Sequence, residues 1–215
     1  GAGSYDGGVQ VGATYLESSK IATANIVIRP GTLDRLELFL REISLPVDEP
    51  LAMDFNATDQ YGNEIAGVKV VWNIEKGGSI NDTGVLTAGR KSGTFQDALT
   101  AVATHAGYKQ TAVATLTVQP GTLAAVTIEP PTLRSTTLGV VADLEARASD
   151  RYGNEITSSL RTAWAAEGGF IDGQGHFNAK SKAGSANIHV SIKSEQIVRS
   201  TLLNMVWGVD LRNTV

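Results

Sequence analysis

The heptapeptide Asp59-Gln-Tyr-Gly-Asn-Glu-Ile65 returns 91 positions later as Asp150-Arg-Tyr-Gly-Asn-Glu-Ile156, with one letter changed. Asp side chains accept backbone N–H bonds in turns, Gly adopts positive φ without steric cost, and Asn tolerates the left-handed region. The heptapeptide therefore predicts a turn that joins two strands. The residues that we assign to this turn are Asp59, Gly62 and Asn63 in the first copy and Asp150, Gly153 and Asn154 in the second.

The repeat extends well beyond the heptapeptide. The segment PGTLDRLEL from Pro30 matches PGTLAAVTI from Pro120, and VVWNIEKGGSINDTGVLTA from Val70 matches TAWAAEGGFIDGQGHFNA from Thr162. Self-similarity over a fixed period is the signature of a repeated domain. We therefore expect one domain over residues 30–119 and a second over residues 120–207.

The two ends of the chain fit the same repeat. The stretch VQVGATYLESSKIATANIVIRPGTL from Val9 aligns without a gap to LTAVATHAGYKQTAVATLTVQPGTL from Leu99, which closes the first domain. We therefore expect residues 1–29 to be the closing hairpin of a preceding repeat. Residues 208–215 should be the stub of a following repeat, so that the chain would be cut from a longer array.

Strand patterns fill both copies. Leu51, Met53, Phe55 and Ala57 alternate with other residues, and Gly, Asn, Asp and Pro clusters interrupt such runs roughly every 8–12 residues. Leu33–Leu45 could also suit a short helix, but the second copy has Pro130-Pro131 there, which a helix interior does not accept. The fold class predicted is all-β, with tandem immunoglobulin-like antiparallel β-sandwich domains.

Composition excludes several classes of partner. The 215 residues carry a net charge of −4, whereas nucleic-acid binding needs clustered Lys and Arg, so we expect no nucleic-acid partner. No apolar stretch approaches the roughly 20 residues that span a bilayer, so we expect no membrane insertion within this chain. The absence of cysteine excludes disulfides, thiolate nucleophiles and Cys-based zinc sites.

A family resemblance rests on four features: the Asp-x-Tyr-Gly-Asn-Glu-Ile turn, a Trp on the next strand, Gly-Gly-x-Ile, and Gly-x-x-x-Ala. Together they resemble the bacterial Ig-like (Big) domains, which occur in tandem in surface adhesins of the invasin and intimin kind. The resemblance implies a non-catalytic spacer or adhesion module at the cell surface. Its implied partners are neighbouring repeats of the same chain and a host or cell-surface protein or glycan.

Trp72 and Trp164 occupy equivalent positions in the two copies. Such residues could stack on sugars, but a Trp on the strand after this turn is more often the core plug of an Ig-like sandwich. We therefore predict that both indoles belong to the core.

Calcium is the one cofactor that the sequence suggests. Acidic residues gather around both turns, and calcium takes six to eight oxygen ligands. Asp59 and Asp150 are the candidate metal ligands, although an Asp-Gly-Asn turn needs no metal. We predict no catalytic residue, since the three histidines lack metal-ligand spacing and no Gly-x-Ser-x-Gly motif is present.

Two other functions stay open at this stage. The domains could be accessory, carbohydrate-binding parts of a secreted glycan-degrading enzyme. Alternatively, the chain could be a surface-layer or filament subunit in which the hairpin over Val9–Ile28 adds strands to a neighbouring molecule.

Overall fold

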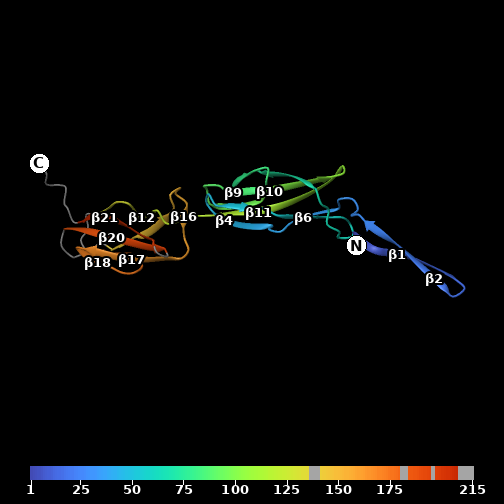
Figure 1. Ribbon diagram of the computed structural model, residues 1–215. Coiled ribbons are helices and arrows are strands. Elements are labelled where there is room, and N and C mark those ends of the chain that lie inside the picture. Colours follow the sequence, from blue (N-terminus) through green and yellow to red (C-terminus); the bar gives the residue numbers. More distant parts are fainter. Residues whose placement is uncertain (136–140, 180–183, 195–196, 208–215) are drawn as a thin grey trace. The chain divides into compact units, whose positions relative to one another are not determined.

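The computed structural model describes residues 1–135, 141–179, 184–194 and 197–207, and every regular element among them is a β-strand (Figure 1). The chain divides into two compact units, Gly1–Val118 and Gln119–Val215. The predicted all-β fold is confirmed, and each unit contains an immunoglobulin-like sandwich. The described residues form no helix that is long and apolar enough to cross a membrane. The stub expected over 208–215 lies outside the described residues.

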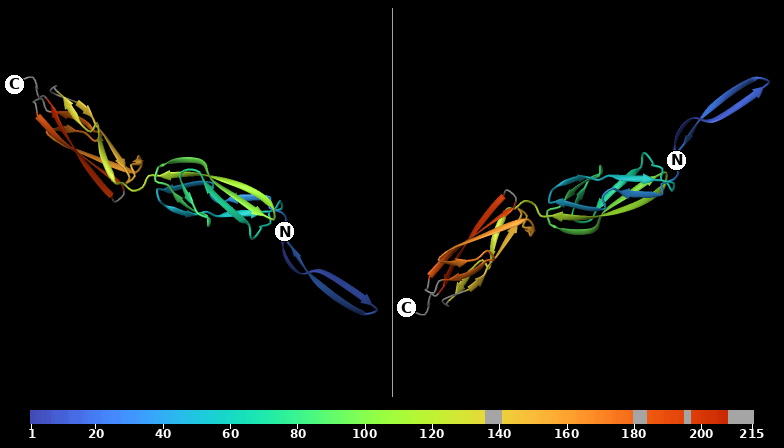
Figure 2. Two further views of the ribbon diagram at one scale, coloured as in Figure 1. Left: turned by 90° about the horizontal axis from the view of Figure 1, so that it is seen from above. Right: turned by 90° about the horizontal axis from the view of Figure 1, so that it is seen from below.

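Unit 1 holds a separate hairpin and a two-layered sandwich (Figure 2). The hairpin is β1 (Gly3–Tyr15) and β2 (Ser18–Ile28). One sheet of the sandwich has the order β4 (Glu42–Pro46), β11 (Tyr108–Gln119), β10 (Gly93–His105) and β7 (Lys69–Ile74). The other layer comprises β3 (Arg35–Leu38) with β6 (Phe55–Thr58), and β5 (Pro50–Ala52), β9 (Val85–Ala88) and β8 (Gly78–Ile80).

Unit 2 has a similar two-layered arrangement, in which a third short strand joins the pair that corresponds to β3 and β6. Its four-stranded sheet has the order β13 (Leu133–Ser135), β21 (Ile197–Trp207), β20 (Gly184–Ser194) and β17 (Leu160–Glu167), with β13 parallel to β21. The facing strands are β12 (Ala125–Glu129), β15 (Glu145–Ser149) and β16 (Glu155–Ile156), and β14 (Val141–Asp143), β19 (His176–Ala179) and β18 (Gly169–Ile171).

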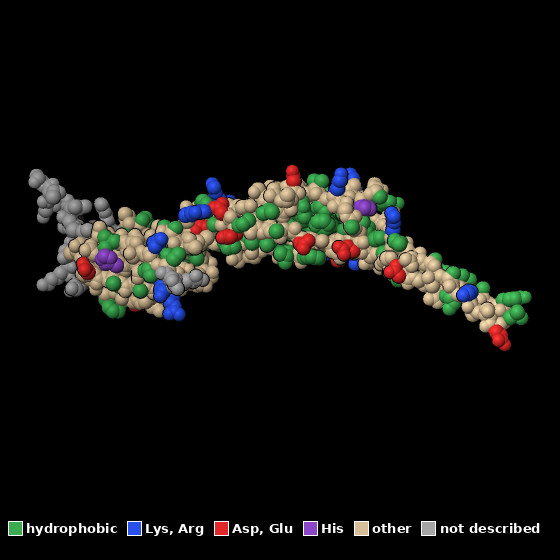
Figure 3. Space-filling view, in the orientation of Figure 1, with side chains coloured by type: hydrophobic (Ala, Val, Ile, Leu, Met, Phe, Trp, Pro, Cys, Tyr) green, Lys and Arg blue, Asp and Glu red, His purple; other side chains and the backbone are tan. Residues whose placement is uncertain are grey.

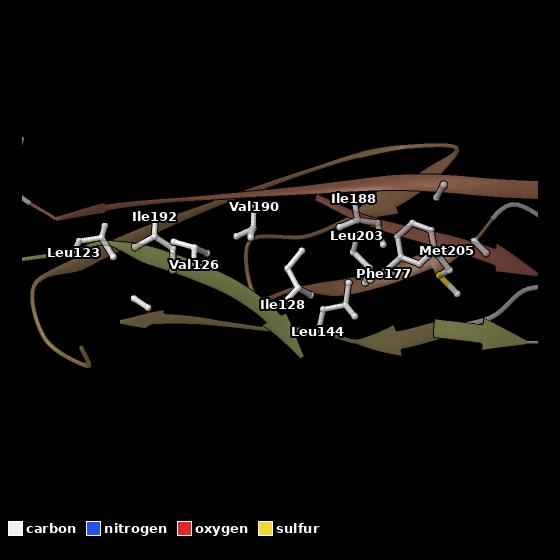
Figure 4. Close-up of a cluster of buried hydrophobic side chains, with 13 residues drawn as sticks. Leu123, Val126, Ile128, Leu144, Phe177, Ile188, Val190, Ile192, Leu203 and Met205 are labelled. Atoms are coloured by element: carbon white, nitrogen blue, oxygen red, sulfur yellow. The ribbon is translucent and has the colours of Figure 1, made fainter. Parts of the chain in front are cut away.

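The core of unit 2 lies between its two layers (Figure 4). Strand β20 shows why: Ala186, Ile188, Val190 and Ile192 are buried, while the residues between them point to the opposite face. Phe177 from β19 is the largest fully buried side chain and meets this face from the other layer. The alternation of the sequence thus decides which face each strand buries.

The two indoles lie at the margin of the core. Trp72 and Trp164 are half-buried, and each covers the glycine of a nearby turn. A Cβ atom on Gly84 would lie 3.0 Å from Trp72 Nε1, and one on Gly175 would lie 3.2 Å from Trp164 Cζ2. Trp164 also packs against the core cluster of unit 2 as a partly buried side chain. The assignment of Trp72 to the core stays a prediction.

Two phenylalanines of the β18–β19 hairpin test this core. Phe177 is fully buried, whereas Phe170 is 69% exposed. We expect Phe177→Ala to lower the free energy of unfolding by about 3–5 kcal/mol, because it removes buried apolar surface and leaves a cavity. Phe170→Ala should cost less than about 0.5 kcal/mol. Denaturant unfolding measures both, and equal losses would contradict the core described here.

Candidate functional site

The carboxylate of Asp59 is the centre of the repeated turn in unit 1. Its side chain is buried, and its Oδ1 atom accepts the backbone N–H groups of Tyr61 and Asn63, both at 2.9 Å. Its Oδ2 atom accepts the backbone N–H of Gly31 at 2.7 Å and the side-chain Nδ2 of Asn63 at 2.8 Å. Each oxygen therefore holds two donors.

Asp150 repeats this set in unit 2. Its Oδ1 accepts the backbone N–H groups of Tyr152 at 2.8 Å and Asn154 at 2.9 Å. Its Oδ2 accepts Gly121 N–H and Asn154 Nδ2, both at 2.8 Å. Because the same atoms make the same bonds in both units, we treat this carboxylate clamp as the candidate functional site.

The backbone of the turn explains the glycine of the motif. Gly62 donates its N–H to the carbonyl of Asp59 at 3.0 Å, and Asp59 donates to the carbonyl of Asn63 at 3.0 Å. Gly62 has φ of 79° and Gly153 has φ of 82°, a region that favours glycine. Tyr61 is 79% exposed, so its ring takes no part in the clamp.

The donors also control the charge of both carboxylates. The hydrogen bond from the Asn63 side chain, followed by that from Gly31, lowers the pKa of Asp59 from 3.8 to about 2. Burial raises the pKa of Asp150, but the bonds from Asn154, Gly121 and Tyr152 together outweigh burial, and the net pKa is lowered. Both groups are therefore ionised in neutral solution.

The clamp ties the first residues of each domain to its turn. Gly31 follows the end of β2 at Ile28 by three positions, and Gly121 follows the end of β11 at Gln119 by two. Only Pro120 lies between β11 and the clamped Gly121. The bond to the carboxylate therefore shortens the stretch between the preceding strand and the first fixed residue of the domain.

Asn63 extends the clamp to the base of the β1–β2 hairpin. Its Oδ1 atom accepts the backbone N–H of Ala2 at 2.7 Å, while its Nδ2 atom donates to Asp59. An amide side chain suits this position because it carries an acceptor and a donor together. Asn63 therefore connects the start of β1 to the buried carboxylate.

Two further turns show what an Asp-x-x-Gly or Asn-x-x-Gly turn needs by itself. Asn81 Oδ1 accepts the N–H groups of Thr83 at 3.1 Å and Val85 at 2.8 Å. Asp172 Oδ1 accepts the N–H groups of Gln174 and His176, both at 2.9 Å. One oxygen suffices for the turn, so the second oxygen of Asp59 and Asp150 is the one that reaches the linker.

The predicted calcium site remains a prediction. Both oxygens of Asp59 and Asp150 face N–H hydrogens, whose partial positive charge opposes a cation at the same place. Nowhere in the described ranges do three or more His, Cys, Asp or Glu side chains come together in a way that could hold a metal ion. The hydrogen bonds give both carboxylates a structural role that requires no metal.

Sequence reasoning assigned the turn residues but missed Gly31 and Gly121. The bond to each glycine spans 28 positions in unit 1 and 29 in unit 2, so no local turn rule predicts it. One signal was present: the segment Pro-Gly-Thr-Leu stands in both copies at the same place before the heptapeptide.

The chain matches no protein-family model and no curated protein. Among solved structures it is similar to Drosophila N-cadherin EC1-4, with a TM-score of 0.48 and 13% identity over 85% of this chain and 51% of that one. It is similar to the Escherichia coli adhesin FdeC, with a TM-score of 0.48 and 17% identity over 86% and 68%. Surface layer protein SbsC, domains 4-9, gives a TM-score of 0.35 and 17% identity over 96% and 35%. Likeness of this degree assigns no activity, ligand or partner to the chain.

The clamp predicts a pH-dependent loss of stability on Asp59→Asn. The amide keeps one acceptor for the turn but turns an NH2 group toward the Gly31 and Asn63 donors, so we expect the melting temperature to fall by several degrees at pH 7. Because the folded pKa of Asp59 lies below its unfolded value, its contribution is complete above about pH 4. It is lost as the pH falls from 3.8 to about 2, so the two proteins should converge there.

Asp172→Asn is the matched control for this experiment. Asn81 fills the equivalent turn of unit 1 with an amide, and the ion pair that Asp172 makes with His176 is partly exposed to solvent, so this substitution should change the melting temperature little. A difference between wild type and Asp59→Asn that stays constant down to pH 2 would contradict the role of the carboxylate charge.

Calcium addition separates the clamp from a metal site. A ligand that binds only the folded state raises the melting temperature, by an amount that grows with its concentration. We expect about 5 mM calcium chloride to change the melting temperature by no more than about 1 °C. A rise of several degrees that disappears in the double variant Asp59→Asn, Asp150→Asn would establish the calcium site instead.

Proposed function

We propose that this chain is a non-catalytic extracellular spacer and adhesion module of a repetitive bacterial cell-surface protein. The observation that carries the proposal is the clamp. In each unit one buried carboxylate accepts the N–H of a glycine that lies shortly after the preceding strand. Between the end of β11 at Gln119 and the bound Gly121, only Pro120 remains.

A spacer needs joints that resist bending. Proline fixes its own φ near −65°, and a linker of one residue offers few other torsions. Because each carboxylate belongs to the same unit as the glycine that it binds, every added repeat would bring its own stiff joint. This geometry supports a function in spacing.

The cell-surface part of the proposal rests on the motif. The Asp-x-Tyr-Gly-Asn-Glu-Ile turn resembles that of bacterial Ig-like domains, and the clamp gives its Asp and its Asn a physical role. We infer that the partners are neighbouring repeats of the same chain, together with a host or cell-surface protein or glycan.

Spin-label distances test the spacer function. The chain has no cysteine, so Lys109→Cys in unit 1 and Lys193→Cys in unit 2, both exposed, give two unique labels. We expect a narrow distance distribution by double electron–electron resonance in the otherwise native chain. Asp150→Asn should broaden it at least about twofold, because Gly121 is released and the free linker lengthens.

Asp172→Asn in the same doubly labelled chain is the control, since Asp172 makes the same turn bonds without a bond to the linker. It should leave the distribution unchanged. If the native chain is already as broad as the Asp150→Asn variant, the joint is flexible and the spacer function fails.

A further inference from the structure

The hairpin β1–β2 presents an apolar face that no strand among the described residues covers. Its two strands form a two-stranded sheet of their own, and nearly all of their residues are exposed. Val9 is 49% exposed, Ile26 37% and Ile28 48%. Figure 3 shows apolar side chains along this hairpin.

The hairpin β10–β11 has the same construction, shifted by 90 positions. In β1–β2 the pairing runs from Gly3↔Ile28 to Tyr15↔Ser18, and in β10–β11 it runs from Gly93↔Val118 to His105↔Tyr108. The two hairpins therefore share length, register and direction.

The irregularities also coincide. The register shifts between Tyr5 and Val9 in the first hairpin and between Phe95 and Leu99 in the second. Inside this bulge Gly7 has φ of 65° and Asp97 has φ of 47°. A bulge fixes how a hairpin twists and which residues it points inward, so a shared bulge indicates a shared packing surface.

In unit 1 the structure shows what covers such a surface. Leu99, Leu116 and Val118 are at most 1% exposed, because the layer containing β3, β6, β5, β9 and β8 faces them. Strand β4 lies beside β11, and strand β7 lies beside β10. Val9, Ile26 and Ile28 occupy the same positions in β1–β2, where the described part of the chain supplies neither this layer nor the two neighbouring strands.

We propose that β1–β2 is the closing hairpin of a further Ig-like domain, and that its apolar face is covered by the body of a repeat that precedes it in the same polypeptide. A two-stranded hairpin is at best marginally stable in water and needs further strands or a packed layer. The partner is a repeat body built like residues 30–92, which lacks a closing hairpin of its own.

The surroundings of β10–β11 in unit 1 also indicate the chemistry of this partner. It supplies an apolar layer toward Val9, Ile26 and Ile28, and two strands whose backbone groups pair with the free edges of β1 and β2. Ala13 and Ala24 correspond to Ala103 and Ala114, which are buried in unit 1, so the covering layer approaches closely there.

The test fuses a second copy of residues 30–92 directly ahead of Gly3, so that this body runs into β1 as it runs into β10 in unit 1. Units 1 and 2 remain intact. We expect amide hydrogen exchange in β1–β2 to slow at least about 100-fold relative to the unfused chain. Val9→Asp should abolish this protection, whereas Gln10→Asp, on the opposite face, should keep it.

A second variant guards against a failure of the fused body to fold. Residues 3–28 replace residues 93–118 within the chain, so that β1–β2 closes unit 1, and cooperative unfolding of unit 1 is expected. Absence of protection in the fusion together with an unfolded unit 1 in the replacement overturns the proposal.

Light scattering and hydrogen exchange of the unfused chain test whether a second copy of this chain covers the apolar face instead. A dimer whose β1–β2 amides are already protected would mean that a second copy covers the face, and this too overturns the proposal. The inference concerns the hairpin alone, so its failure would leave the spin-label result on the joint between units 1 and 2 unaffected.

Discussion

In each domain the first residues are held by a buried aspartate whose two oxygens accept four N–H donors. Burying a charge is costly unless every lone pair is used, so the donors of Asp59 and Asp150 are a requirement of the fold. The requirement works in both directions: the charge needs the turn and the linker glycine, and these orphan N–H groups need the charge. The turn and the linker glycine therefore stabilise each other through the carboxylate. In unit 1 this carboxylate couples segments 28 positions apart.

The proposed spacer function rests on this coupling. The carboxylate and the linker glycine that it binds lie in the same unit, so each repeat contains all the residues of this hydrogen bond. In arrays of repeats, stability and shape come from units and their nearest-neighbour connections. The hairpin β1–β2 is also connected to the turn of unit 1, because Ala2 at its base donates its N–H to Asn63.

Much of this could be predicted from the sequence because the rules involved are local. Alternation predicted the strands, and Gly62 and Asn63 indicated the turn through their backbone preferences. The bond from Gly31 to Asp59 is not local, and a carboxylate that accepts N–H groups looks the same in sequence as one that binds calcium. The sequence also does not show that Trp72 lies against Gly84, because a Cβ atom at position 84 would meet the indole only in the folded chain.

Four turns among the described residues begin with Asp or Asn, and they differ in whether a second side-chain oxygen is present and in what it binds. Asn81 caps its turn with its single oxygen, and Asp172 gives its second oxygen to His176 at 2.8 Å, which lowers the pKa of Asp172 and raises that of His176. Asp59 and Asp150 give theirs to the linker. An amide would supply the one oxygen that the turn needs in all four places. The aspartates at positions 59 and 150 supply a second oxygen, which accepts the linker N–H and the side-chain amide of Asn63 or Asn154. The second oxygen therefore distinguishes the turns that bind the linker from the turns that do not.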